Sequence, residues 1–220
     1  SNLIILAARP AMGKTAVALD YAYYPAKQGT PVGFFSLEMT GKELAGRLMS
    51  KESYISSQKI NNNLVNTDEL TALRKDCLTF KGLPLYIDDT PALSIQRLRS
   101  KALRMKREFG IEMLIIDYLQ LMDGISAKDN REQEISKISR GLKKLAKELD
   151  IPIIALSQLS RQVEMRTDKK PQLSDLRDSG AIEQDADMVV FLLRPEYYGI
   201  EQYLYGDSPI DTKGLMIHII

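Results

Sequence analysis

The sequence has few of the features that mark secreted, membrane-spanning or strongly charged proteins. Its only cysteine is Cys77, so no disulfide can form within the chain, and nothing resembles a signal peptide. No apolar run approaches the roughly 20 residues that a membrane span needs. Lysine and arginine total 30 and aspartate and glutamate 29, which leaves a net charge of +1 and no bulk attraction to nucleic acid. These absences predict a cytoplasmic protein that needs no membrane, and any contact with DNA must be local.

What is present suits one α/β domain. The 220 residues are 44% hydrophobic and 27% charged, and apolar stretches rich in Ile, Val, Leu and Phe recur between helical patterns. Near-continuous apolar strands that alternate with helices predict a mainly parallel, twisted sheet with helices on both faces. The expected strands cover residues 3–6, 32–36, 85–87, 113–116, 153–156, 188–193 and 215–220. Thr40 and Glu43 have the spacing of a capping box and predict that a helix begins after Thr40.

The most informative stretch is the first expected strand and the residues that follow it. In the pattern GxxxxGK[ST], backbone N–H groups surround phosphates, the lysine reaches the β- and γ-phosphates, and the hydroxyl holds Mg²⁺. Gly13, Lys14 and Thr15 fit this pattern, whereas Ala8 replaces the first glycine. The alternative is a chance match on a loop, but the preceding strand and the following helical segment favour a nucleotide site. The stretch predicts binding of ATP and Mg²⁺ by Ala8, Arg9, Pro10, Ala11, Met12, Gly13, Lys14 and Thr15.

Two carboxylates follow expected strands and suit the remaining needs of ATP hydrolysis. Asp117 ends the apolar run 113–116 and is assigned with Thr15 to Mg²⁺, usually through water. Glu38 follows 32–36 in apolar surroundings and is assigned to activation of the attacking water. The alternative for each is a carboxylate paired with a neighbour or capping a helix. Because ligands gather at the carboxyl ends of parallel strands, two such positions favour catalysis.

A third expected strand ends at Gln158, which can contact the γ-phosphate or its water and signal hydrolysis to the next segment. That segment is polar and carries basic residues, among them Arg166, Lys169 and Lys170. Charge alone favours these three cations as a DNA contact. The alternative is a mobile surface loop. Lys14, Glu38 and Gln158 are therefore the predicted catalytic residues.

Five motifs together resemble the C-terminal, RecA-like motor domain of bacterial replicative DNA helicases of the DnaB type. They span nearly the whole chain: Ala7-Ala8-Arg9-Pro10 leading to Gly13-Lys14-Thr15, Phe35-Ser36-Leu37-Glu38-Met39, Ile116-Asp117-Tyr118-Leu119-Gln120-Leu121, Leu156-Ser157-Gln158-Leu159-Ser160-Arg161, and Ser174 through Asp187. Alanine at position 8 is usual in that family. The resemblance implies a RecA-like P-loop NTPase fold and a hexameric ring that encircles single-stranded DNA and moves along it as ATP is hydrolysed between subunits.

The resemblance also implies roles that the residues alone do not establish. The DNA-contacting turn of the family maps onto Arg177, Asp178, Ser179 and Gly180, where Asp178 stands in place of the more usual Glu. A glycine turn with one arginine can hold successive phosphates without reading bases. Primase and a helicase loader are the implied partners. We favour the turn as the main DNA contact and keep Arg166, Lys169 and Lys170 as a second surface facing the pore.

The ends of the chain lead to a further expectation. It opens on the phosphate-loop strand and closes inside an apolar run, which suggests a single domain over residues 1–220 that is truncated at both ends relative to the family. The family's arginine finger is expected beyond Ile220, so the chain alone should hydrolyse ATP poorly. Two rival functions remain: a RecA-type recombinase or repair ATPase, and a nucleotide-gated ring scaffold that is not a motor.

Overall fold

The computed structural model describes residues 1–122, 131–205 and 208–220; within these ranges the side chains at 61, 76, 77, 79, 120, 131, 132, 177–181 and 205 are not described. The helices are α1 (Lys14–Lys27), α2 (Gly41–Ser53), α3 (Ser57–Asn61), α4 (Thr67–Phe80), α5 (Ile95–Phe109), α6 (Arg131–Leu149) and α7 (Gly180–Asp185). The strands are β1 (Leu3–Ala8), β2 (Val32–Ser36), β3 (Leu85–Asp88), β4 (Met113–Asp117), β5 (Ile153–Gln158), β6 (Met188–Leu193), β7 (Gln202–Tyr205), β8 (Ser208–Asp211) and β9 (Ile217–Ile219). Short 3₁₀ segments are η1 (Leu119–Leu121), η2 (Arg161–Met165), η3 (Leu173–Ser179) and η4 (Pro195–Tyr198).

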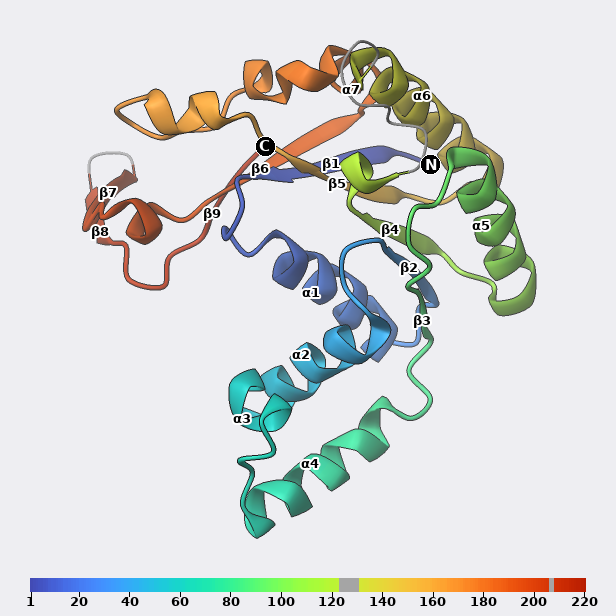
Figure 1. The fold of residues 1–220 in the computed structure, drawn as a ribbon, viewed down its shortest axis with the longest axis vertical. Helices are drawn as coiled ribbons and strands as arrows, with labels where there is room; N and C mark the ends of the chain where they lie inside the picture. The colour runs from blue at the N-terminus through green and yellow to red at the C-terminus, as the bar shows by residue number, and fades with distance from the viewer. Residues whose placement is uncertain (123–130, 206–207) are drawn as a thin grey trace.

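Seven strands form one sheet in the order β3-β2-β4-β5-β1-β6-β9 (Figure 1). All the pairs are parallel except β6 with β9, which is antiparallel. Each of the seven expected strands is present in this sheet, so the predicted mainly parallel α/β fold is confirmed. The interior strand β1 pairs with the middle strand β5, about 150 residues later in the chain, with Ala8 opposite Gln158. The same edge of the sheet therefore receives residues from widely separated motifs.

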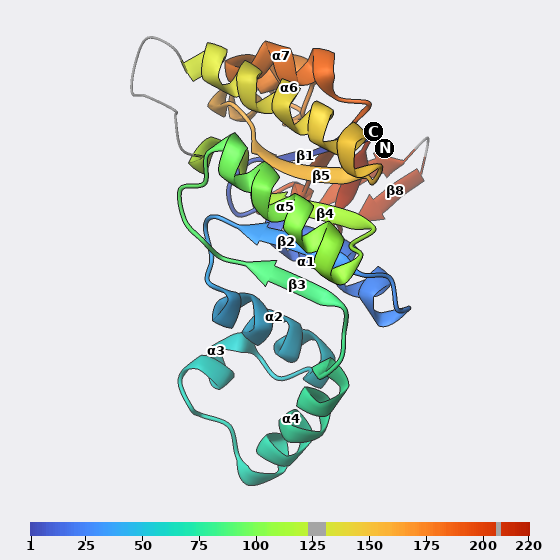
Figure 2. The same cartoon turned by 90° about the vertical axis from the view of Figure 1, so that its right-hand side faces the viewer.

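Side chains alternate between two cores, one on each face of the sheet. In β1, Leu3 and Ile5 pack with α5, α6 and α7, whereas Leu6 packs with α1 and α2. In β4, Ile116 belongs to the first core and Ile115 to the second, as the two-residue repeat of a strand requires. Figure 2 shows α5, α6 and α7 stacked along their side of the sheet. Both faces are therefore covered by helices, which explains why these strands are apolar at nearly every position.

Helices α2, α3 and α4 extend beyond the edge strand β3, where α4 lies farthest from the sheet in both views (Figures 1 and 2). Helix α2 begins with the predicted capping box: the Thr40 hydroxyl accepts from the Glu43 amide, and the Glu43 carboxylate accepts from the Thr40 amide at 2.8 Å. The β7–β8 hairpin was not predicted, because its strands are largely exposed and lack an apolar repeat. Within the described ranges, no helix combines the length and apolar character needed to cross a bilayer.

Candidate nucleotide-binding site

The phosphate loop joins the end of β1 to the start of α1. Gly13 occupies the N-cap position of α1 with φ of 84°, a left-handed conformation that favours glycine. Its carbonyl accepts from the Val17 amide at 3.0 Å, which starts the helix. Ala8 is still part of the extended strand β1, so alanine fits where the sequence pattern has glycine. The helix start therefore presents backbone N–H groups toward the site, as phosphate binding requires.

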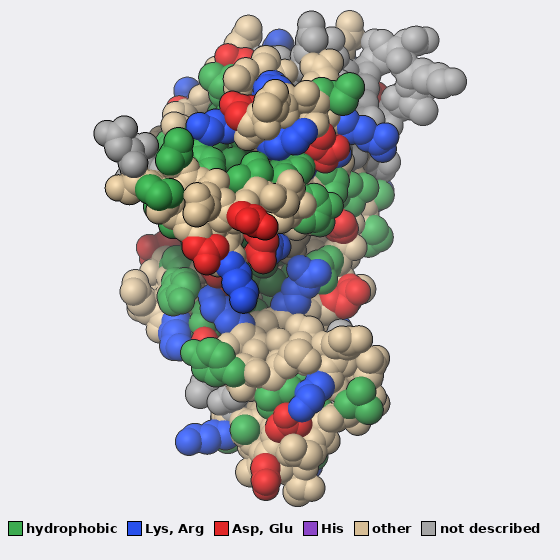
Figure 3. Space-filling view, turned by 90° about the vertical axis from the view of Figure 1, so that its left-hand side faces the viewer, with side chains coloured by type: hydrophobic (Ala, Val, Ile, Leu, Met, Phe, Trp, Pro, Cys, Tyr) green, Lys and Arg blue, Asp and Glu red, His purple; other side chains and the backbone are tan. Residues whose placement is uncertain are grey.

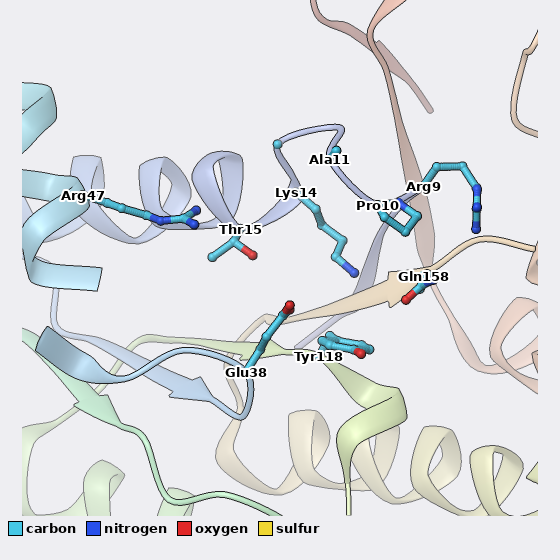
Figure 4. A pocket seen from close by; sticks show the side chains of 10 residues that line it. Arg9, Pro10, Ala11, Lys14, Thr15, Glu38, Arg47, Tyr118 and Gln158 are labelled. Atoms are coloured by element: carbon cyan, nitrogen blue, oxygen red, sulfur yellow. The ribbon is translucent and has the colours of Figure 1, made fainter. Parts of the chain in front are cut away.

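The site is a cavity of about 360 Å³ at the carboxyl ends of the central strands. Its lining comes from the phosphate loop, the turn after β2, helix α2, the residue after β4 and the end of β5: Arg9, Pro10, Ala11, Gly13, Lys14, Thr15, Glu38, Arg47, Tyr118 and Gln158 (Figure 4). Figure 3 shows charged side chains of both signs gathered across the middle of one face of the molecule, above the helices that extend past β3. The cavity is thus polar and suited to a charged ligand.

Lys14 is the cation at the centre of the cavity. Burial lowers the pKa of its ammonium, while the charges of Asp117 and Glu38 oppose this effect. Tyr118 follows Asp117 across a cis peptide bond, and its ring centroid lies 4.6 Å from Lys14 Nζ. This distance is within the range of a cation–π contact. Lys14 is therefore held between anionic groups and an aromatic ring, in reach of a ligand entering the cavity.

Thr15 and Asp117, the two residues predicted to hold Mg²⁺, are hydrogen-bonded to each other. The Thr15 hydroxyl donates to Asp117 Oδ2 at 2.7 Å, and the carboxylate is fully buried. Its other oxygen, Oδ1, has no hydrogen-bond partner among the residues that the structure describes. Burial raises the pKa of this carboxyl group, an effect that the Thr15 hydrogen bond and the charge of Lys14 oppose. A hydroxyl beside a carboxylate with one free oxygen fits Mg²⁺, which prefers oxygen ligands and retains bound waters.

Glu38 lines the cavity, but its surroundings differ from the expectation. Strand β2 ends at Ser36, whose hydroxyl donates to the Met39 carbonyl and accepts from the Met39 amide. This turn directs Leu37 into the core and leaves Glu38 exposed. The prediction of apolar surroundings for Glu38 was therefore wrong, because the chain leaves the sheet before reaching that residue. Figure 4 shows the carboxylate directed toward Lys14 and Thr15.

The structure brings most of the predicted site residues together and adds two. Lys14, Thr15, Glu38 and Gln158 line one cavity, and Asp117 joins them through Thr15. Ala8 and Met12 are buried in the core beneath the loop, so their only possible contact with a phosphate is through the backbone. Sequence reasoning missed two lining residues, Arg47 and Tyr118. Tyr118 could have been found from its place beside Asp117, whereas Arg47 reaches the cavity only through the direction of α2.

Arg9 lies at the opposite end of the cavity from Arg47 (Figure 4). Its side chain is 9% exposed, and the guanidinium donates to the Leu159 carbonyl at 2.8 Å and to the Glu164 carboxylate at 2.9 Å. Arg9 therefore connects the phosphate loop to the segment after β5.

The predicted DNA-contacting cations have partners within the chain. Arg166 forms a two-pronged ion pair with Asp175, and Lys169 Nζ donates to the Glu164 carbonyl at 2.6 Å. Lys170 Nζ lies 5.3 Å from the ring centroid of Tyr203. The backbone at positions 177–180 runs from η3 into α7, but the side chains of Arg177, Asp178 and Ser179, and the surroundings of Gly180, lie outside the described residues. DNA binding by either group stays a prediction.

The fold and the cavity define the class of protein. A glycine-containing phosphate loop lies between the first strand and first helix, and acidic residues from neighbouring parallel strands meet its lysine and threonine. This arrangement is that of a RecA-like P-loop nucleotide-binding domain. The fold resemblance extends to a KaiC-like protein from Pyrococcus horikoshii OT3, with a TM-score of 0.54 over 87% of this chain at 17% identity.

The chain belongs to the family of DnaB-like helicase C-terminal domains, whose model matches residues 1–217. It is 50% identical over 209 residues to the replicative DNA helicase DnaB of Rickettsia bellii, covering 90% of this chain and 42% of that protein. The DnaB of Geobacillus stearothermophilus is 48% identical over 200 residues, with 90% and 44% covered. The chain therefore spans less than half the length of these relatives. The family resemblance inferred from the motifs is confirmed.

Two solved structures are similar over most of the chain. One, described as an ATPase domain, has a TM-score of 0.84 and 44% identity, covering 90% of this chain and 71% of that one. The other is a DnaB-like replicative helicase, described together with its interactions with primase. It has a TM-score of 0.85 and 39% identity over 99% of this chain and 54% of that one.

Proposed function

We propose that this chain is the ATP-hydrolysing motor domain of a replicative DNA helicase, which binds ATP with Mg²⁺. In the full-length protein it acts in a hexameric ring that moves along single-stranded DNA and unwinds the duplex at the replication fork. The observation that carries the proposal is the single cavity in which Lys14, Thr15, Glu38 and Gln158 meet, with Asp117 hydrogen-bonded to Thr15. Membership of the DnaB-like family supports the assignment to a helicase rather than to another P-loop ATPase.

Different residues of the cavity bind the phosphates and the metal ion of ATP–Mg²⁺. Backbone N–H groups at the start of α1 and the ammonium of Lys14 hold the β- and γ-phosphates. The Thr15 hydroxyl and the Asp117 carboxylate would hold Mg²⁺. When bound, Mg²⁺ would offset the negative charge of the phosphates. The ordered pair of Thr15 and Asp117 is already formed, so little rearrangement is needed on this side of the cavity.

The hydrolytic step uses the groups on the other side of the cavity. Glu38 orients a water molecule and accepts its proton on a carboxylate oxygen as the water attacks the γ-phosphate. Gln158 hydrogen-bonds to the water or to a γ-phosphate oxygen. Arg47 lies on the wall near Glu38 and Thr15 and adds a positive charge toward the transferred phosphoryl group. The bond between the γ-phosphorus and the β–γ bridging oxygen breaks as the new bond to water forms, so ADP is the leaving group and inorganic phosphate the second product.

Single-stranded DNA is proposed to bind at the turn formed by residues 177–180, that is Arg177, Asp178, Ser179 and Gly180. A second DNA-contacting surface is formed by Arg166, Lys169 and Lys170. One similar solved structure is described by its interactions with primase, which supports primase as a partner of the full-length protein. A helicase loader and a cytoplasmic location complete the proposal.

Glu38→Gln in the full-length protein tests the motor against its rivals. The variant should bind a fluorescent ATP analogue with nearly unchanged affinity but lose at least a hundredfold in turnover stimulated by single-stranded DNA, because Gln cannot accept the proton. Glu112→Gln, an exposed position at the other end of β4, is the control and should match wild type. If Glu38→Gln leaves turnover unchanged, the result favours a nucleotide-gated ring scaffold over a motor. Electron microscopy separates a ring-forming helicase from a recombinase, which would form filaments on DNA.

A further inference from the structure

The segment between β5 and η3, residues 159–172, is fixed at its beginning to the phosphate loop. Arg9 of that loop donates through Nη1 to the Leu159 carbonyl at 2.8 Å and through Nε to Glu164 Oε1 at 2.9 Å. The Arg9 side chain is 9% exposed and Glu164 is 40% exposed, so the contact with the Leu159 carbonyl is buried while the ion pair with Glu164 is partly open to solvent. Together the two contacts hold the guanidinium in one orientation. Glu164 thus connects η2 directly to the loop that surrounds the proposed phosphate site.

The far end of the same segment is fixed to η3. Asp175 is 1% exposed and receives the two-pronged ion pair from Arg166, and its carboxylate also accepts from the Gln172 amide at 2.7 Å. Its carbonyl accepts from the Ser160 amide at 3.0 Å, which closes the segment into a ring of contacts. The η3 backbone then continues into positions 177–180. Two ion pairs therefore connect the phosphate loop to the proposed DNA-contacting turn.

Residues 159–172 contain η2 but no strand and no α-helix, so their stiffness depends on the contacts of η2. Val163 in η2 is 1% exposed and packs in the core below α6, which anchors η2 beside Glu164. Lys169 Nζ donates to the carbonyl of Glu164 itself, so the residue is held through both its side chain and its backbone. These contacts hold η2 as a unit, so a displacement of Arg9 would move η2 together with Glu164.

We propose that Glu164 is a positioning residue that couples the nucleotide site to the DNA-contacting turn through its ion pair with Arg9, with Arg166 and Asp175 carrying the displacement onward. This inference rests on the proposed helicase function. Glu164 contacts neither ATP nor DNA in the arrangement described above. Its effect is confined to the difference in DNA affinity between nucleotide states, which is a coupling free energy shared by the two sites.

The test measures that coupling in the full-length protein. The dissociation constant of a fluorescent single-stranded oligonucleotide is determined with a non-hydrolysable ATP analogue and with ADP, and the ratio of the two constants defines the coupling. Glu164→Gln keeps the size of the side chain and removes its charge at a position that is 40% exposed. We expect the ratio to fall at least fivefold toward one, while affinity for the ATP analogue without DNA changes less than twofold. Glu164→Asp, which retains the charge but withdraws it from Arg9, should give an intermediate loss. Glu112→Gln is the matched control and should retain the wild-type ratio.

The outcomes separate this inference from the proposed function. If wild type binds DNA equally well in both nucleotide states, or not at all, the helicase function itself fails. If wild type shows the ratio and Glu164→Gln retains it, the coupling role is overturned while the function stands. A loss of nucleotide affinity that is equal with and without DNA also overturns it, because the ion pair then only supports the loop. Hydrogen exchange gives a second readout: wild type should show protection in residues 172–180 that changes with nucleotide, and the variant should lose that change. If either Glu164 variant fails to fold, the pair is structural and the inference is overturned.

Discussion

Replacing Asp117 by asparagine should make the nucleotide-free chain more stable. The carboxylate is fully buried, one of its oxygens has no described partner, and the net effect of its surroundings is to raise its pKa. A raised pKa means that the fold disfavours the anion even after the Thr15 hydrogen bond and the charge of Lys14 are included. Asparagine has the same shape and still accepts from Thr15, so the substitution removes chiefly the charge.

The size of this effect follows from the cost of a buried, incompletely paired polar group, about 1 to 3 kcal/mol. Asparagine leaves one polar atom unpaired as well, so we expect a gain near the lower end, about 1 kcal/mol. For a chain of this length that raises Tm by about 2 to 4 °C. In the presence of Mg²⁺ and ATP, wild type should instead be more stable than Asp117→Asn. A ligand at a hundredfold excess over its Kd stabilises the folded protein by about 2.7 kcal/mol. The variant should lose much of this stabilisation, because it lacks the carboxylate proposed to hold Mg²⁺.

Thermal unfolding followed by circular dichroism, with and without Mg²⁺ and ATP, measures both effects. Asp175→Asn is the matched control, because Asp175 is equally buried but is paired with Arg166 and with a backbone amide. That substitution should lower stability by about 1 to 3 kcal/mol, the cost of leaving hydrogen-bonding groups without their partner, because Arg166 is 26% exposed and solvent offsets part of the lost charge pairing. A fall in Tm for nucleotide-free Asp117→Asn, or shifts of the same sign in both variants, would refute the reasoning.

Three further predictions concern catalysis and helix packing. Arg47→Gln should lower kcat by about a hundredfold with little change in Tm, measured by single-turnover hydrolysis in the full-length protein; an unchanged rate would remove Arg47 from the site. Thr40→Ala should cost about 1 kcal/mol in thermal unfolding through loss of the capping box, whereas Thr71→Ala within α4 should cost less. In Gly141→Ala the new Cβ would lie 2.6 Å from Ile95 Cγ1, so packing strain of about 1 to 3 kcal/mol should outweigh the gain of about 1 kcal/mol in helix propensity. Tm should fall, and a rise would contradict the packing argument.

The strands were predictable because burial on both faces makes each one continuously apolar, as in residues 113–116 and 153–156. That Lys14, Thr15 and Asp117 lie together was predictable because each stands at or just after the carboxyl end of an apolar strand, where the ends of neighbouring parallel strands meet. The exposure of Glu38 depends on a turn made by Ser36, which apolar periodicity does not reveal. The contribution of Arg47 depends on how α2 packs, a property of the assembled domain. The β7–β8 hairpin was not predicted from the sequence because its exposed strands have no apolar repeat.

The order of strands in the sheet has a consequence for how the domain is made. Lys14, Thr15, Glu38 and Asp117 all precede residue 118, yet the strand that leads into the phosphate loop, β1, has β5 and β6 as its neighbours. A growing chain that ends before residue 153 contains most of the phosphate-binding groups but has no partner for β1. Pairing between segments so distant in sequence is slow compared with local helix formation. The domain should therefore gain its affinity for nucleotide late in synthesis, after β5 and β6 have left the ribosome, and shorter N-terminal pieces should bind none.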